Sequence, residues 1–333
     1  MLADGVAGTG HSARDHNLGV HHATSSGCVC ARATLHGLSP AETTRQTIGR
    51  RQKTSDVAMD SATDSLRERF LSEGFLAPVR ILDEPDALAH RARMEQAERS
   101  FGDLHYRAKV YTILRSPMEL ATHPRVLDVV TTLIGPNVLL WNGTYIVKEP
   151  HTPAHVSWHQ DLAYWGLDGE DQVSMWLALS TADETSGCMR MVPGSHRAGR
   201  QGHRLTTDES NVLYQGQTVD EVDEADAVTC ALRPGEASFH HGWTLHSSMS
   251  NRSGDRRIGF NAQYIATHVR QTQHDRDTAI LVHGSDDFGH FGADIRATGD
   301  LEPAAVARQR ELDRQVRETM GRGLKNALTT RLV

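Results

Sequence analysis

The segment NVLLWNGTYIVKEPHTPAHVSWHQD, residues 137–161, marks a change in the character of the chain. Asn137–Lys148 and Val156–Asp161 are short, rich in β-branched and aromatic residues, and bounded by proline and polar residues, which is typical of strands. Further strands are expected at Gln172–Thr181, Met189–Val192, Ala227–Leu232, Ala237–His240 and Ile258–Ile265. Many short strands after a helical N-terminal third predict a β-sandwich or jelly roll with helices packed outside.

Helices are predicted on both sides of this β-rich part. Asp64 or Ser65 can cap a first helix that Gly74 ends, and a second is expected over Pro85–Ser100. A third is expected over Met118–Leu133, before Gly135-Pro136, and a last over Glu302–Leu328, where apolar residues recur at helical spacing. We find no internal repeat.

Residues 1–58 differ from the rest because glycine, serine, alanine and histidine dominate without an apolar period. We predict that they are a disordered extension or follow a wrongly assigned start, and that Met59–Val333 form the domain. The segment lacks the apolar core of a secretory signal. Its pairs Cys28/Cys30 and His21/His22 are interpreted as ordinary tail residues.

Composition narrows the class of protein. The chain has 333 residues, 38% hydrophobic, with a net charge of −7, which suits one large globular domain. It has no basic stripe for nucleic acid and no apolar run of about 18 residues for a membrane span. Four cysteines without a CxxC pair indicate a reducing, cytoplasmic location. We expect a monomer or homodimer that binds a small molecule.

The pair His159-Gln160-Asp161 is the first candidate for a metal site. On a strand, residues two apart share a face, so the imidazole and carboxylate would converge. With a second histidine they would form the facial triad that holds non-haem Fe(II) and leaves positions open. The pair alone is weak, because roughly 2.5 such triplets are expected by chance from the composition. A strand-edge histidine paired with an aspartate is the alternative.

The third metal ligand, and a residue that could bind a carboxylate, are expected in the segment Gly235–Ile265. His246 follows an apolar residue at the end of a strand-like run, and Arg257 opens the next strand. We expect Arg257 near the metal, one strand across, and interpret His240 and His241 as structural residues or supports for the ligands. A buried guanidinium binds a carboxylate through two parallel hydrogen bonds. Open iron positions beside Arg257 suit 2-oxoglutarate, because its 2-oxo acid end can chelate the iron while its distal carboxylate meets the guanidinium. The neighbouring Arg256 should point the other way, toward solvent.

Three segments, in order, resemble the phytanoyl-CoA dioxygenase family of Fe(II)- and 2-oxoglutarate-dependent oxygenases, which includes natural-product tailoring hydroxylases. They are SWHQDLAYWGL, VSMWLALSTADETSGCMRMVPGSHRAG and LRPGEASFHHGWTLHSSMSNRSGDRRIGF. The resemblance runs from about Leu66 to about Phe291, and it implies a mainly β fold with flanking helices around a double-stranded β-helix (jelly roll, cupin-like) core.

The resemblance implies roles for six residues. His159, Asp161 and His246 would bind Fe(II). Arg257 and Ser248 would bind the distal carboxylate of 2-oxoglutarate. Trp176 would pack against this cosubstrate, or would be an ordinary core tryptophan. Supporting roles are assigned to Trp158 and Gln160, and Lys148 and Tyr145 are candidates to reach the pocket.

The implied reaction is an oxidation by O2 that releases succinate and CO2 and hydroxylates an unactivated C–H bond of a small metabolite or natural-product intermediate. In halogenating relatives a small residue replaces the carboxylate, so Asp161 favours hydroxylation, although desaturation and ring formation use the same chemistry. Two alternatives are a cupin-like metalloenzyme that does not use 2-oxoglutarate and a non-catalytic metal-binding protein.

Loops are expected to form the outer wall of the pocket and to determine the substrate. The candidates are Asp103–Tyr111, Tyr164–Glu170, His196–Val219 and Thr267–His290.

Overall fold

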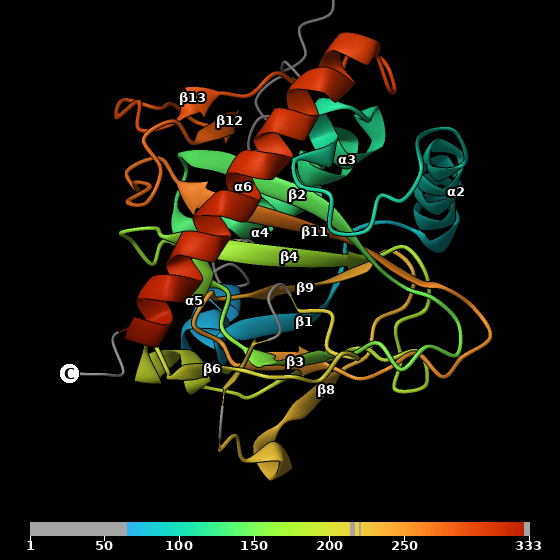
Figure 1. The fold of residues 1–333 in the computed structure, drawn as a ribbon, viewed down its shortest axis with the longest axis vertical. Helices are drawn as coiled ribbons and strands as arrows, with labels where there is room; N and C mark the ends of the chain where they lie inside the picture. The colour runs from blue at the N-terminus through green and yellow to red at the C-terminus, as the bar shows by residue number, and fades with distance from the viewer. Residues whose placement is uncertain (1–64, 214–216, 220, 330–333) are drawn as a thin grey trace, which may run out of the picture. The chain divides into compact units, whose positions relative to one another are not determined.

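The computed structural model describes residues 65–213, 217–219 and 221–329, with side chains up to residue 323. The predicted extension over residues 1–58 therefore lies outside the described residues. Figure 1 shows the strands lying one above another, with the long helix α6 (Pro303–Thr329) running diagonally across the view in front of them.

Two β-sheets form the core. The larger sheet has the order β1 (Phe75–Arg80), β9 (Glu236–His240), β4 (Gln172–Ala178), β11 (Arg257–Ala266), β2 (Val138–Lys148), β12 (Thr278–His283) and β13 (Gly292–Ala293). The smaller sheet has the order β3 (Val156–His159), β10 (His246–Ser248), β5 (Met189–Met191) and β8 (Val228–Cys230). Strands β6 (His203–Leu205) and β7 (Gln217–Val219) form a separate hairpin. This is the double-stranded β-helix that the sequence predicts.

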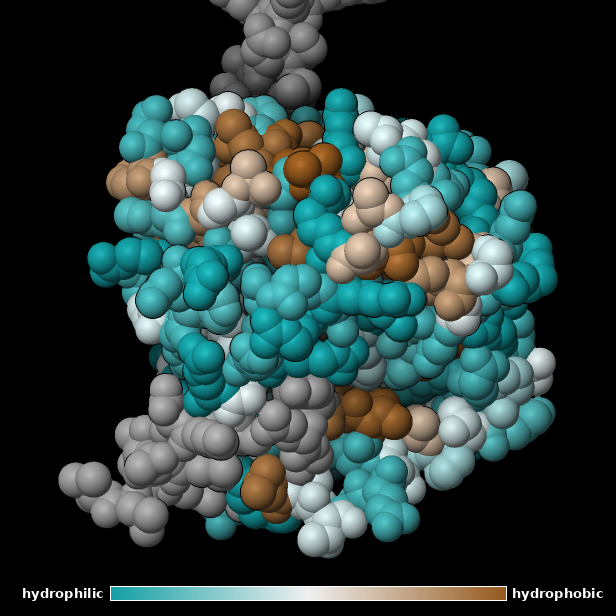
Figure 2. Space-filling view, turned by 45° about the horizontal axis from the view of Figure 1, so that its top comes forward, coloured by the Kyte–Doolittle hydropathy of each residue, from teal (hydrophilic) through white to brown (hydrophobic). Residues whose placement is uncertain are grey.

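Two helices of the described chain are long, α2 (Glu84–Phe101) and α6. The shorter ones are residues 65–73, α3 (Arg115–Ala121), α4 (Pro124–Ile134) and α5 (Leu162–Trp165), with 3-10 turns η1 (Val110–Thr112), η2 (Ser195–Ala198) and η3 (Glu224–Asp226). None of the helices in the described part of the chain is both long and apolar enough to cross a membrane. On the face drawn in Figure 2, polar side chains predominate and apolar ones gather in separate patches.

One predicted helix is in fact two. The single helix expected over Met118–Leu133 is interrupted at Thr122-His123, so that α3 ends at Ala121 and α4 begins at Pro124. The proline ring disfavours helical geometry in the preceding residue, and His123 is extended and caps α4 by accepting a hydrogen bond from the Arg125 amide.

Alternation along the central strands separates a helix-covered face from an inner face. On β11, Ile258, Phe260, Ala262 and Tyr264 pack into the core with the helices, and the Tyr264 hydroxyl donates to the Ala121 carbonyl at 2.8 Å. The residues between them face the smaller sheet. Both faces of β11 are therefore buried, and the inner face is free to carry polar groups toward a cavity between the sheets.

Candidate metal centre

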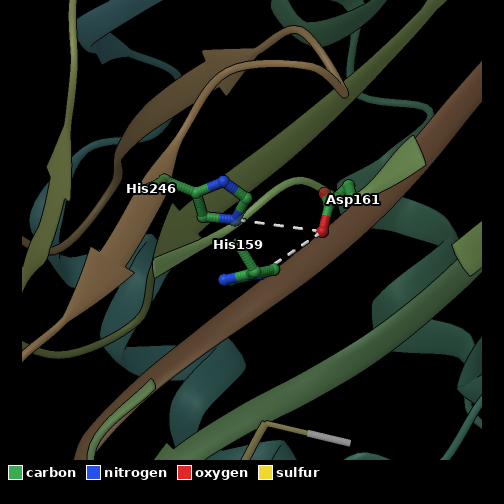
Figure 3. A group of neighbouring side chains, drawn as sticks. All are labelled: His159, Asp161 and His246. Carbon is green, nitrogen blue, oxygen red and sulfur yellow. Dashed lines mark ion pairs between the residues drawn. The ribbon is translucent and has the colours of Figure 1, made fainter. Parts of the chain in front are cut away.

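His159, Asp161 and His246 converge between the two sheets (Figure 3). The Asp161 Oδ1 atom lies 3.6 Å from the Nε2 atom of His159 and 3.8 Å from the Nε2 atom of His246. One potential ligand atom from each residue lies within 4.8 Å of the other two. Two imidazole nitrogens and one carboxylate oxygen at this spacing can enclose a divalent transition metal and leave further coordination positions open.

Strand pairing and a helix start bring these residues together. His159 ends β3 and lies directly opposite His246, which begins β10 rather than ending a strand. The prediction that Asp161 continues the strand is wrong. The chain turns at Gln160, and Asp161 has helical dihedral angles at the start of α5. The carboxylate reaches the imidazoles because this tight turn brings it back over the end of β3, not because of strand periodicity.

Backbone carbonyls fix the orientation of both imidazoles. The Nδ1–H group of His159 donates to the Ser157 carbonyl at 2.9 Å, and that of His246 donates to the Thr244 carbonyl at 3.0 Å. Each ring therefore carries its proton on Nδ1 and presents the Nε2 lone pair to Asp161. A histidine that ligates a metal commonly has its other nitrogen held in this way.

The electrostatics of the cluster favour the protonation states that a metal requires. Burial favours the neutral acid of Asp161, but the imidazoles of His159, His240 and His246 outweigh it and hold the pKa of this carboxyl well below its ordinary value. Burial, together with the neighbouring His159 and His240, lowers the pKa of His246 well below its ordinary value. An ionised carboxylate and neutral imidazoles are the forms that bind metal.

Two residues hold the second oxygen of Asp161. Its Oδ2 atom accepts a hydrogen bond from the Ser174 hydroxyl at 2.9 Å and lies 3.2 Å from the His240 Nε2 atom. These contacts leave Oδ1 directed toward the two imidazoles. His240 thus supports a candidate ligand, whereas His241 lies near Phe70 and His196 instead. Ser174 gives no sequence signal, because it lies on β4, where strand pairing places it opposite His240, and it meets Asp161 only in the folded protein.

Replacing Ser174 with alanine is expected to lower metal affinity by about 10- to 100-fold, the usual effect of losing a hydrogen-bond partner of a ligand. Anaerobic Fe(II) titration calorimetry would measure it. Ser238→Ala is the matched control, because Ser238 is also a buried serine of the larger sheet and its hydroxyl has no partner among the described residues. Equal affinities of the Ser174 and Ser238 variants would contradict the role of Ser174.

Arg257 lies across the cavity from this cluster. Its strand β11 belongs to the larger sheet and His246 to the smaller one, so the expectation that it lies one strand across is wrong: the two residues face each other between sheets. The loop between β10 and β11 carries the chain from one sheet to the other. The neighbouring Arg256, expected to face solvent, is instead half-buried and pairs with Glu98 and Glu149.

The guanidinium of Arg257 is buried without a counterion. Only 1% of the residue is exposed, its Nε atom has no hydrogen-bond partner, and it forms no ion pair within the described part of the chain. Burial lowers the pKa of Arg257 to about 10, so the group remains charged at neutral pH. A buried cation that lacks a protein partner is costly, and an anionic ligand would offset that cost.

Trp176 forms the floor beneath this guanidinium. The Arg257 Cζ atom lies 4.3 Å from the centre of the indole, which is a cation–π contact. Gly259 makes room for the ring, because a Cβ atom at this position would lie 2.0 Å from the Trp176 Cζ2 atom. Trp176 is therefore both a core residue and a wall of the cavity.

We expect Gly259→Ala to displace Trp176, which would move Arg257 and cost about 1–3 kcal/mol through overpacking. The KM for a ligand anchored by Arg257 should rise by about tenfold or more, while metal affinity stays near that of the native protein. Gly254→Ala is the control, because its added Cβ would meet nothing within 4 Å. Thermal unfolding and ligand titration would measure both effects, and an unchanged KM would contradict the prediction.

The other predicted residues divide between the cavity and the core. Ser248 is buried and lines the cavity, and its hydroxyl accepts a hydrogen bond from Lys148 Nζ at 2.8 Å. Tyr145 does not reach the pocket, because it faces the helices and its ring packs on Phe260 at 5.6 Å. Gln160 and Trp158 point away from the cluster. The Gln160 amide donates to Gly199 and Trp243 carbonyls, and the Trp158 indole donates to Glu224.

The cavity that holds these groups has a volume of about 310 Å³. Three of the four predicted loop regions contribute to its wall, through Tyr106, Ala108, Tyr164, Val212 and Leu213. The fourth, Thr267–His290, contributes no lining residue in the described structure. Instead, α6 lines the cavity with Asp313, Val316, Arg317 and Met320. The amphipathic spacing of α6 was visible in the sequence, but its packing partner was not.

A cluster that could hold a metal and an unpaired buried arginine thus share one cavity inside a double-stranded β-helix, an arrangement suited to a metal-dependent enzyme. The sequence model of the phytanoyl-CoA dioxygenase (PhyH) family matches residues 69–259. The chain belongs to this family.

Individual relatives agree with this membership. The probable alpha-ketoglutarate-dependent hypophosphite dioxygenase of Stutzerimonas stutzeri is 28% identical over 149 residues, which are 43% of this chain and 52% of that protein. Peroxisomal phytanoyl-CoA dioxygenase of Bos taurus is 28% identical over 137 residues, 40% of this chain and 41% of that protein. The matched stretch thus spans about half the length of these relatives or less.

Among solved structures, the non-heme monooxygenase ThoJ in its apo form is similar, with 29% identity and a TM-score of 0.70, covering 78% of this chain and 99% of ThoJ. ThoJ has also been solved as a nickel complex, with 28% identity and a TM-score of 0.66 at the same coverage. Most of the described fold therefore has a counterpart in an enzyme whose structure holds a transition metal.

Proposed function

We propose that this protein is a non-haem iron dioxygenase that uses Fe(II), O2 and 2-oxoglutarate. The observation that carries the proposal is the pairing, across one cavity, of the His159–Asp161–His246 cluster with the unpaired Arg257 guanidinium. One end of the cavity suits a divalent metal and the other suits a carboxylate. Family membership and the nickel complex of ThoJ support the same function.

In this proposal His159, Asp161 and His246 hold the iron through three ligands and leave the remaining positions for small molecules. Arg257 binds the distal carboxylate of 2-oxoglutarate, Ser248 donates a hydrogen bond to it, and Trp176 supports the guanidinium from below. The bound metal and cosubstrate supply the oxidising chemistry, in which O2 is consumed and succinate and CO2 are released. The protein orients these groups and keeps bulk water out, as the burial of both imidazoles and of Arg257 allows.

We infer that the substrate is a small molecule that is hydroxylated at an unactivated C–H bond. Asp161 supplies the carboxylate that completes the three protein ligands. This favours hydroxylation over halogenation, because a halogenating relative has a small residue in place of the carboxylate. The cavity of about 310 Å³ must also accept the cosubstrate, so the remaining room is limited. Asn261 and Gln263 line it, and each has a buried side-chain oxygen without a partner among the described residues. A substrate with hydrogen-bond donors, such as a polar metabolite or natural-product intermediate, would satisfy them.

The test is incubation of the protein with Fe(II), 2-oxoglutarate, O2 and candidate metabolites, with succinate as the product measured. Anaerobic titration of the Fe(II)-loaded protein with 2-oxoglutarate gives an independent readout that requires no substrate. Binding of metal without 2-oxoglutarate would favour a cupin-like metalloenzyme of another kind. Binding of both without succinate from any metabolite would favour a non-catalytic protein.

A further inference from the structure

A second buried cation lies beside Arg257. Lys148 is paired with Arg257 across β2 and β11, and only 1% of each residue is exposed. Neither residue forms an ion pair with a carboxylate of the described residues. Two neighbouring cations without an acid are unusual in a protein interior, because each is costly alone and they repel each other.

Lys109 provides the contrasting case within the same fold. It is also 1% exposed, but its Nζ atom lies 2.9 Å from the Asp294 carboxylate and donates to the Trp141 and Thr278 carbonyls. This is the ordinary arrangement of a buried lysine, with a counterion that neutralises it. The lack of such a counterion at Lys148 therefore calls for a specific explanation.

The contacts of Lys148 involve neutral groups only. Its Nζ atom donates to the Ser248 hydroxyl oxygen at 2.8 Å, to the Ser248 carbonyl at 3.2 Å and to the Met249 carbonyl. An ammonium group has three hydrogens and no lone pair, so these three acceptors satisfy it completely. The hydroxyl hydrogen of Ser248 cannot then point to Lys148 and is free to point into the cavity.

A neutral amine would reverse this hydrogen bond. With two hydrogens and one lone pair, Lys148 could donate to the two carbonyls and accept the hydroxyl hydrogen of Ser248. Ser248 would then offer only its oxygen to the cavity. The proton on Lys148 therefore determines whether Ser248, which lines the cavity, is a hydrogen-bond donor there.

We propose that Lys148 is a positioning residue whose protonated form directs the Ser248 hydroxyl toward the distal carboxylate of the cosubstrate, so that cosubstrate binding takes up a proton. This inference rests on the function proposed above. It assigns the anion site two cations with different tasks: Arg257 binds the carboxylate directly, and Lys148 acts through Ser248.

The surroundings of Lys148 support a change of its protonation state on binding. Burial, and then the charge of Arg257 on β11, lower the pKa of Lys148 to about 6, while the Cys188 thiol acts weakly in the opposite direction. His105 also lies near this pair of cations, and burial lowers its pKa. Glu149, the next residue along the chain, pairs with Arg256 at the surface. An incoming carboxylate is thus the missing counterion.

The sign of the pH dependence follows from this. Below about pH 6 Lys148 is already protonated in the free protein, so binding takes up no proton there. Above that pH the free protein holds a neutral Lys148, and each binding event must add a proton. The apparent affinity for 2-oxoglutarate should therefore fall as pH rises, by up to about tenfold per pH unit.

The experiment is anaerobic titration calorimetry of the Fe(II)-loaded protein between pH 6 and 8.5, in buffers of different ionisation enthalpy that report proton uptake. The two probes are 2-oxoglutarate and 2-oxopentanoate, which share the chelating end but differ in the distal carboxylate. Native protein at pH 7.5 should take up close to one more proton with 2-oxoglutarate than with 2-oxopentanoate. The difference between the probes cancels proton changes at the metal.

Variants separate Lys148 from a merely structural role. Lys148→Met should abolish the extra proton uptake, flatten the pH profile and weaken 2-oxoglutarate binding by about tenfold or more. Lys148→Arg keeps a permanent charge, so it should abolish the proton uptake but retain tighter binding than Lys148→Met at high pH. Arg256→Gln, which removes ion pairs with Glu98 and Glu149 but leaves Lys148 and Arg257 in place, should resemble the native protein.

The outcomes distinguish this inference from the function on which it rests. If native protein binds neither 2-oxo acid, the proposed function fails. If it binds 2-oxoglutarate without extra proton uptake, or if Lys148→Met retains that uptake, the role of Lys148 is overturned. The comparison of the two probes on native protein decides the matter even if a Lys148 variant does not fold.

Discussion

Replacing His246 with alanine is expected to reduce succinate formation below detection and to weaken Fe(II) binding by more than 100-fold. Loss of a hydrogen-bond partner to a ligand costs about 10- to 100-fold, and loss of the ligand itself should cost more. His246 supplies one of the two imidazole nitrogens at the candidate site. The neighbouring His240 lies at the other carboxylate oxygen of Asp161, with its Nε2 atom 3.2 Å from Oδ2, so it should not take the place of His246. The same result is expected for His159→Ala.

The measurements are anaerobic Fe(II) titration and succinate detection, with circular dichroism to verify the fold. His290→Ala is the matched control, because His290 is an exposed histidine that contacts only the Phe288 ring among the described interactions. Full turnover by the His246 variant after treatment with a chelator and dialysis would exclude an iron site at this cluster.

Replacing Arg257 with glutamine should raise the dissociation constant for 2-oxoglutarate by about 30-fold or more. Breaking one side of a buried charged pair costs about 2–5 kcal/mol, and each 1.4 kcal/mol is tenfold. Arg257→Lys should not restore binding, because an ammonium cannot reproduce the planar fork that binds a carboxylate and rests on the Trp176 indole. Metal affinity should be unchanged in both variants.

The preference for 2-oxoglutarate over a 2-oxo acid without a distal carboxylate tests the role of Arg257 more specifically than the dissociation constant alone. The native protein should prefer 2-oxoglutarate to 2-oxopentanoate, and the preference should collapse in Arg257→Gln, because only the distal carboxylate meets the guanidinium. Arg256→Gln serves as the control at the neighbouring position, whose side chain pairs with Glu98 and Glu149. A preserved preference in Arg257→Gln would show that the carboxylate binds elsewhere.

Much of the fold can be predicted from the sequence, because strand-forming residues cluster in short runs and glycine and proline mark where helices and strands end. Central strands such as β2 and β11 are rich in apolar, aromatic and β-branched residues, and Gly135 and Pro136 end a helix. The break at Pro124 could have been predicted from the proline alone, but the apolar period continues across it and hides it. The turn after His159 carries no comparable signal, since Gln160 and Asp161 suit a strand as well as a helix start.

The candidate site could be predicted in part, because the histidine, aspartate and arginine residues that carry its chemistry occur in a recognisable order along the chain. His159, Asp161, His246 and Arg257 are identifiable along the chain, and the structure brings the first three together. Ser174, His240 and Gly259 act through contacts with Asp161 or Trp176 that form only in the folded protein. No local pattern reveals such partners, and the contribution of α6 to the cavity likewise depends on packing between distant segments.

The placement of α6 on the cavity has a consequence for protein synthesis. The ribosome makes His159 and Asp161 first, His246 follows 85 residues after Asp161, and the cavity-lining residues of α6 come only after position 312. At about 5–20 residues per second, the two-ligand fragment waits roughly 4–17 s for its third ligand. The nascent chain therefore passes through a stage in which it has all three candidate ligands but lacks the α6 wall of the cavity. At that stage the proposed iron site would be open on the side that α6 later covers.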